Sequence, residues 1–214
     1  MKLSKIAQEL SSKKIEEIQL HPFHQEMKAG TLAKDKFAYY VEQDGIFLQG
    51  AAKSLALLAS KVPVEYVQQF LCYSNDMFVA EEEVVHNFFK KAFNFEETGL
   101  IAPSTLSYTN FHLSTCALQP VEVGVAAMLP GFLVYHQIGL SLAKEVVPNN
   151  PYQRWIETYS GADFGNAANE VEHVFNSLAE NTTEALRKKM IETFSHGVCL
   201  EWHFCNDCYN KALL

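Results

Sequence analysis

Apolar residues recur at three- and four-residue steps along most of this chain, which is the pattern of amphipathic helices. A clear example near the N-terminus is LSKIAQELSSKKIEEI, and similar stretches follow as far as the C-terminus. No segment alternates apolar and polar residues for long enough to predict a strand. We therefore predict an all-α fold of about seven helices packed around one core, as a single domain over residues 1–214.

Breaks in the pattern give the expected helix boundaries in the first half of the chain. HPFHQEMKAG predicts a turn or a short helix, and a new, long and mostly apolar helix begins around Lys34–Lys36. Pro63 is suited to the first turn of a further helix, which the pattern extends to Phe93. After a loop-like segment, Ser104 or Thr105 is the expected cap of the next helix.

The second half of the chain contains similar breaks between predicted helices. PNNPYQ separates a long apolar helix from another that begins near Asp163. Asn181, with Glu184 three residues later, resembles an N-cap with its reciprocal acidic partner. The last helix is expected to begin there.

The apolar helix contains MLPGFLVYHQIG, in which Pro130 and Gly131 are adjacent and should weaken an ordinary helix. Val123–Ala143 carries no charged residue, and about 20 such residues can span a bilayer. However, the flanks lack paired aromatic and basic anchors. Polar residues also interrupt the run: Tyr135, His136, Gln137 and Ser141. We interpret it as a buried helix beside a polar pocket rather than a linker or a membrane span.

Composition narrows the function classes. A hydrophobic share of 48% in 214 residues fills a sizeable core, and a net charge of -8 argues against nucleic acid or anionic lipid as a partner. The N-terminus is charged and contains no apolar block for secretion. Five cysteines without regular spacing fit a reducing compartment. We expect a cytoplasmic protein.

Two carboxylates fall on apolar helix faces. Asp44 shares one face with Tyr40, Phe47 and Ala51. Glu201 shares its face with Phe204, Cys205 and Cys208. For either acid alone a structural hydrogen bond or partial exposure is the simpler explanation. Two such acids on different helices favour a site, because an apolar setting raises a carboxyl pKa and suits it to acid–base catalysis.

Two ExxH motifs are the main metal-like signal. Glu83 with His86, and Glu170 with His173, have the spacing by which ferritin-like bundles hold two irons. Asp44 or Glu201 would have to complete such a site. Solvated surface pairs are the simpler reading of so short a motif. A di-iron oxygenase is thus an alternative function.

The cysteines do not predict a zinc site. On a helix, Cys199 and His203 point one way while Cys205 and Cys208 point nearly the opposite way. Buried thiols in apolar helices are usually inert. We expect no metal and no other cofactor.

The order of the informative segments resembles the TenA family (thiaminase II, aminopyrimidine aminohydrolase). These segments are HPF, GTL, FAYYVEQD, SYT, LPGFLVYHQIG, NPYQRWIETYSG and LEWHF, and the resemblance extends from about His21 to Tyr209. It implies a heme-oxygenase-like all-helical fold, usually a homotetramer. The implied reaction removes an amino group from a thiamine-derived pyrimidine to give hydroxymethyl pyrimidine for salvage, and some members cleave thiamine itself.

The resemblance also implies roles for single residues. Asp44 is similar to the carboxylate that pairs with the ring nitrogen and amino group of the pyrimidine, and Glu201 to the acid that transfers protons. Phe204 is similar to the aromatic residue that stacks on the ring. The remaining substrate-binding positions are Phe47, Tyr108, Gly131, Tyr135 and Tyr159.

Gly131 is where this chain departs from the family pattern. Many members have a cysteine there that attacks the pyrimidine, and a branch without it is associated with hydrolysis of amino- or formylamino-pyrimidines. Gly131 and Tyr135 are four residues apart, so we expect space beside that tyrosine for a water activated by Glu201.

Three questions stay open at this level. Glu82 and Glu83 are candidates for the second acid, although the sequence places neither in the cavity. Possible substitute nucleophiles are Cys72, Cys116 and Cys205, none of them favoured. A pyrimidine-binding protein without catalysis is a further alternative.

Overall fold

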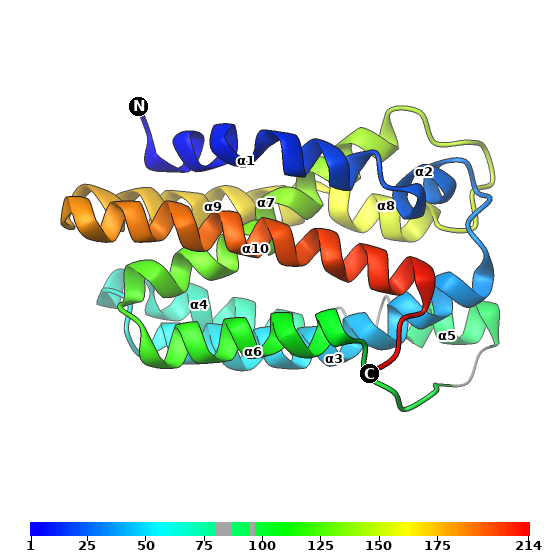
Figure 1. The fold of residues 1–214 in the computed structure, drawn as a ribbon, viewed down its shortest axis with the longest axis horizontal. Helices are drawn as coiled ribbons and strands as arrows, with labels where there is room; N and C mark the ends of the chain where they lie inside the picture. Colours follow the sequence, from blue (N-terminus) through cyan, green and yellow to red (C-terminus); the bar gives the residue numbers. More distant parts are fainter. Residues whose placement is uncertain (80–86, 95–96) are drawn as a thin grey trace. The chain divides into compact units, whose positions relative to one another are not determined.

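The computed structural model describes residues 1–79, 87–94 and 97–214, and in these residues the regular structure is entirely helical (Figure 1). The described helices are α1 (Leu3–Gln19), α2 (Pro22–Lys28), α3 (Lys34–Ala59), α4 (Val64–Asp76), α5 (Asn87–Phe93), α6 (Pro103–Leu118), α7 (Val121–Ala143), α8 (Gln153–Ser160), α9 (Ala162–Glu180) and α10 (Glu184–Asn210). The all-α prediction is confirmed. The chain divides into two compact units, Met1–Thr31 with Glu122–Trp202, and Leu32–Val121 with His203–Leu214.

Some helices are shorter than the sequence pattern predicts. The helix expected from Pro63 to Phe93 is α4, which ends at Asp76 before a π-helical turn at residues 77–79, and α5, which begins at Asn87. Residues 80–86 lie outside the described part of the chain, and with them Glu82, Glu83 and His86. Short helices such as α2 and α8 account for the rest of the difference, because apolar periodicity is weak over seven or eight residues.

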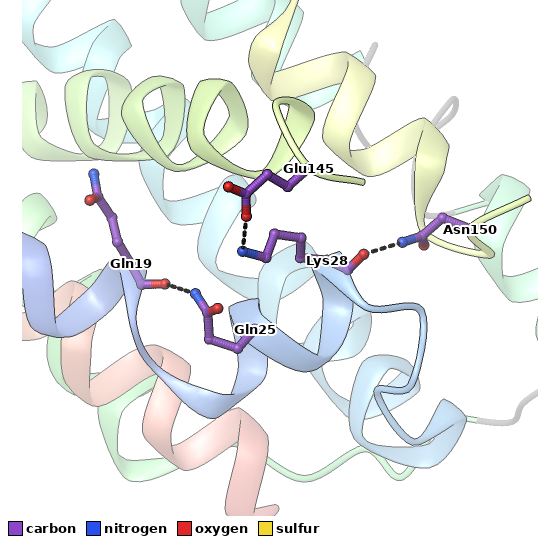
Figure 2. Close-up of polar contacts among 5 residues, drawn as sticks. All are labelled: Gln19, Gln25, Lys28, Glu145 and Asn150. Carbon is purple, nitrogen blue, oxygen red and sulfur yellow. Dashed lines mark hydrogen bonds and ion pairs between the residues drawn. The ribbon is translucent and has the colours of Figure 1, made fainter. Parts of the chain in front are cut away.

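In the first unit, α1 packs against α2 and α9, and α8 packs against α9. His21 caps α2, since its Nδ1 accepts a hydrogen bond from the backbone N–H of Phe23. The buried Asn150 side chain donates to the carbonyl oxygens of Met27 and Lys28, at 2.8 and 3.0 Å. Figure 2 shows the bond from Asn150 to Lys28 and the ion pair between Lys28 and Glu145. These bonds fasten the α7–α8 connection to the C-terminus of α2.

Helix α7 runs unbroken through Pro130. A side chain at Gly197 of α10 would lie 2.8 Å from Pro130 Cγ, so the two helices meet closely at the proline. By length and hydropathy (1.4) α7 is the described helix that could cross a membrane, but 78% of its apolar window is buried inside the protein. This burial agrees with the interpretation of α7 as a core helix.

In the second unit, α3 packs against α4, α5 and α6 (Figure 1). Two adjacent polar residues of α3, both buried, hold the segment that leads into α6. The Glu42 carboxylate accepts hydrogen bonds from the Thr98 hydroxyl and the Gly99 N–H. The Gln43 side chain donates to the Leu100 carbonyl and accepts from the Ala102 N–H, both at 2.8 Å.

The predicted caps of two helices are wrong. Helix α6 begins at Pro103, and it is the Asp207 carboxylate of α10 that accepts the N–H of Ser104, at 3.0 Å. Asn181 ends α9 instead of opening α10. The hydroxyl of Thr183 accepts a hydrogen bond from the N–H of Leu186 in the first turn of α10, at 3.3 Å. A cap from a distant residue leaves no local signal in the sequence.

Candidate functional site

Asp44 lies in an aromatic setting in the second unit. It is 3% exposed, and it falls between Tyr40 and Phe47 on the same face of α3. The ring of Phe204 on α10 contacts both neighbours, with centroids 5.9 Å from Tyr40 and 5.7 Å from Phe47. Asp44 therefore shares its helix face with two aromatic rings, both of which contact Phe204.

Phe47 also joins a cluster of rings on α6. Its centroid is 4.8 Å from Tyr108 and 5.4 Å from His112, and these two rings are 4.4 Å apart. All three side chains are buried. Sequence reasoning did not select His112, although it lies one helical turn from Tyr108 and so on the same face.

The buried thiols near this cluster are held protonated. Burial raises the pKa of Cys208 well above its usual value, and the negative charge of Asp44 contributes in the same direction. Burial likewise raises the pKa of Cys116 to about 12, although Lys61 opposes it. A thiolate is the nucleophilic form, so neither Cys116 nor Cys208 is suited to act as a nucleophile.

Glu201 lies in the first unit, 1% exposed on α10. A Cβ atom added at Gly131 of α7 would lie 3.7 Å from Glu201 Oε1. Apart from the chain neighbours of Gly131 and the backbone of α7 itself, no other atom of the described residues would lie within 4 Å of it. The expected space beside Tyr135 stays a prediction. The space left by Gly131 adjoins the Glu201 carboxylate.

Tyr135 and Tyr159 meet in the same unit, with ring centroids 5.0 Å apart. Trp155, one turn before Tyr159 on α8, contacts both rings at 6.1 and 4.5 Å. The ring Nδ1 of His136 lies 2.9 Å from the Tyr159 carbonyl oxygen. Trp155 and His136, which both contact Tyr159, were not among the predicted site residues.

The structure thus groups the predicted residues in two sets. One set lies in the second unit and comprises Asp44, Phe47, Tyr108 and Phe204. The other lies in the first unit and comprises Gly131, Tyr135, Tyr159 and Glu201. Helix α10 contributes one residue to each set, Glu201 to the first unit and Phe204 to the second.

The metal-like motifs gain no support from the described residues. Glu170 and His173 are both exposed on α9, as solvated surface residues are. No group of three or more metal-binding side chains occurs in the part of the chain that the structure describes. A surface groove of about 950 Å³ near Met1 and Arg187 contains none of the predicted site residues.

Comparison with known proteins gives evidence that is independent of the site geometry. A protein-family model described as the TENA/THI-4/PQQC family matches residues 7–211. Over 198 residues the chain is 32% identical to the aminopyrimidine aminohydrolase of Bacillus subtilis (strain 168), a match that covers 90% of this chain and 83% of that protein. It is 36% identical over 138 residues to the thiamine biosynthesis multifunctional protein ThiED of Corynebacterium efficiens, covering 63% of this chain and 18% of that longer protein.

A solved structure supports the fold. The TenA homologue from P. horikoshii OT3 matches with a TM-score of 0.89 at 22% identity, covering 98% of this chain and 99% of that one. The likeness shows that the all-α fold is of the heme-oxygenase-like type.

Proposed function

Because the chain belongs to the TENA/THI-4/PQQC family, we propose that it hydrolyses thiamine-derived aminopyrimidines in thiamine salvage. The substrate would be aminomethyl or formylaminomethyl pyrimidine, and the product hydroxymethyl pyrimidine. The similarity to proteins named aminopyrimidine aminohydrolase, at 32% and 29% identity, supports this reaction class.

Asp44 is the proposed anchor of the pyrimidine. A carboxylate accepts hydrogen bonds, so it suits an exocyclic amino group and a protonated ring nitrogen of the substrate. The surrounding rings of Phe47, Tyr108 and Phe204 offer stacking surfaces for a flat heterocycle. Asp44 is 3% exposed, so a ligand bound to its carboxylate would be held largely out of contact with water.

Glu201 is the proposed acid–base group. As a water oxygen attacks the carbon that bears the amino group, the carboxylate takes a proton from the water. It then gives that proton to the leaving nitrogen, so that a C–O bond forms and the C–N bond breaks. The observation that carries this proposal is the space at Gly131, 3.7 Å from Glu201 Oε1, where a cysteine would otherwise supply a sulfur.

Replacement of Glu201 by glutamine tests the mechanism. Gln cannot exchange a proton at neutral pH, so hydrolysis of aminomethyl pyrimidine should fall by about 100-fold or more. Binding of hydroxymethyl pyrimidine, measured by calorimetry, should be largely kept and is the control for folding. Full activity in Glu201→Gln would exclude this role for Glu201.

The lack of a sulfur at Gly131 also supports a second proposal, a pyrimidine-binding protein without catalysis. That function requires tight pyrimidine binding by the wild-type protein with no turnover on either substrate. Measurable release of ammonia or formamide would decide for the hydrolase.

A further inference from the structure

The buried face of α6 carries several hydroxyl-bearing side chains and a histidine, which is unusual for a helix that packs on a core. The buried positions are Ser104, Thr105, Tyr108, His112, Thr115 and Cys116. The exposed face includes Leu106 and Leu118, at 41% and 79% exposure. Buried hydroxyls cost free energy unless they are hydrogen-bonded, so this face needs an explanation.

Thr105 is the extreme case on this face. It is 0% exposed, and its hydroxyl has no hydrogen-bond partner among the described residues. A threonine on a helix can usually bond to a carbonyl one turn earlier, but this one does not. Native proteins leave few such groups unsatisfied, and a bound ligand is one way in which they are satisfied.

Contacts between α3 and α6 show which residue of α3 lies at the same height along the helix pair as Thr105. Gln43 bonds to Ala102, and Phe47 contacts Tyr108 further along both helices. Successive positions of the two helices therefore meet in the same order. On α6, Thr105 lies between Ala102 and Tyr108, and on α3, Asp44 lies between their partners Gln43 and Phe47. Thr105 and Asp44 therefore lie at the same height along the paired helices.

We propose that Thr105 is a further substrate-binding residue, whose hydroxyl hydrogen-bonds to the polar edge of the aminopyrimidine that Asp44 anchors. A hydroxyl both donates and accepts, so it matches a ring nitrogen or an amino group. This inference rests on the proposed function. In the free protein the hydroxyl is an uncompensated buried group, and in the complex it gains a partner.

The test compares Thr105→Val with Thr105→Ser by calorimetric titration of hydroxymethyl pyrimidine and by thermal unfolding of the ligand-free protein. Valine keeps the shape and removes the hydroxyl, so binding should weaken about 3- to 10-fold, the effect of one hydrogen bond. The ligand-free Tm should stay the same or rise, because an unsatisfied polar group is gone. Serine should bind within about twofold of wild type.

Thr109→Val is the matched control. The Thr109 hydroxyl is also buried without a partner among the described residues, but its methyl carbon packs in the space at Gly50, away from Asp44. This variant should leave binding unchanged.

The other possible outcomes distinguish a failure of the proposed role of Thr105 from a failure of the proposed function. Wild-type-like binding by Thr105→Val overturns the role of Thr105 alone. A lower ligand-free Tm in that variant also overturns it, since the hydroxyl then has a structural partner. Failure of the wild-type protein to bind the pyrimidine overturns the proposed function itself.

Discussion

A short side chain at Gly131 of α7 would approach the Glu201 carboxylate. At 3.7 Å from Oε1 the added Cβ makes an ordinary van der Waals contact. The backbone there is helical, so glycine is not needed for its conformation. Packing therefore permits a side chain, and the glycine is explained by the space it leaves.

Substitution of Gly131 by alanine and by cysteine should separate folding from chemistry. The free energy of unfolding of both variants should equal that of the wild type or exceed it by up to about 1 kcal/mol, because glycine is unfavourable inside a helix. Alanine should lower aminopyrimidine hydrolysis on the order of tenfold by displacing the attacking water. Cysteine should in addition gain thiamine cleavage, which paired assays on both substrates would detect. Wild-type hydrolysis by Gly131→Ala would show that the space is not used.

His24 is a buried, neutral imidazole on α2. It is 1% exposed, and its ring Nδ1 lies 2.7 Å from the Ile18 carbonyl oxygen. Burial lowers the pKa of His24 from 6.5 to about 4, against the effect of this backbone bond. The unfolded chain therefore binds a proton at a pH where the folded chain does not.

This shift predicts acid sensitivity. Above pH 6.5 both states are neutral at His24 and its contribution to stability is complete. As the pH falls from 6.5 to about 4, the free energy of unfolding should drop by up to about 3 kcal/mol. Urea unfolding of wild type and His24→Gln at several pH values would measure it. The loss over this range should be smaller in the variant, and equal losses would contradict the assignment to His24.

Among the helices, α7 and α8 meet at a glycine. A Cβ on Gly139 would lie 2.5 Å from the carbonyl carbon of Tyr159 and 2.6 Å from the backbone N of Ser160. Backbone atoms cannot move aside as a flexible side chain can. The close approach also brings His136 within reach of the Tyr159 carbonyl.

Gly139→Ala should therefore separate α7 from the end of α8. We expect a loss of about 3 kcal/mol in the free energy of unfolding and weaker pyrimidine binding, because Tyr159 shifts. Gly45→Ala is the control, since no atom lies within 4 Å of its added Cβ, and it should stabilise α3 by about 1 kcal/mol. Equal stability of the two variants in urea would exclude a tight α7–α8 contact.

Apolar periodicity was sufficient to predict the long helices α3, α7 and α10, because each has many turns over which the pattern repeats. It also placed Asp44 and Glu201 on buried faces. It could not predict the Asp207 cap on α6, since the two residues are 103 positions apart. The ring contacts of His112 and the place of Trp155 depend likewise on contacts between helices.

At the scale of the whole molecule, we propose that copies of the chain associate in the cytoplasm as a homotetramer, the assembly that the family resemblance implies. Helix α6 contains no charged residue, although the chain carries a net charge of -8. Repulsion between two copies is weakest where their charges are absent. The exposed leucines of α6 support such a contact.

Light scattering should give a mass of about four times 24.1 kDa. Leu106→Glu should reduce that mass, because it places a charge on each copy at the contact. Leu10→Glu on the charged helix α1, where the leucine is 69% exposed, should not. A monomeric wild type would contradict the proposal, and equal effects of both variants would place the contact elsewhere.

Both ends of α6 are capped by residues from outside that helix. Asp207 binds the N–H of Ser104, and the Lys61 ammonium binds the carbonyl oxygens of Cys116, Ala117 and Gln119. The opposite charges match the helix dipole at each end. It follows that an isolated peptide of residues 103–118 should be largely unfolded in water. In the intact protein, the α6 amides should exchange with deuterium only when the neighbouring helices also open.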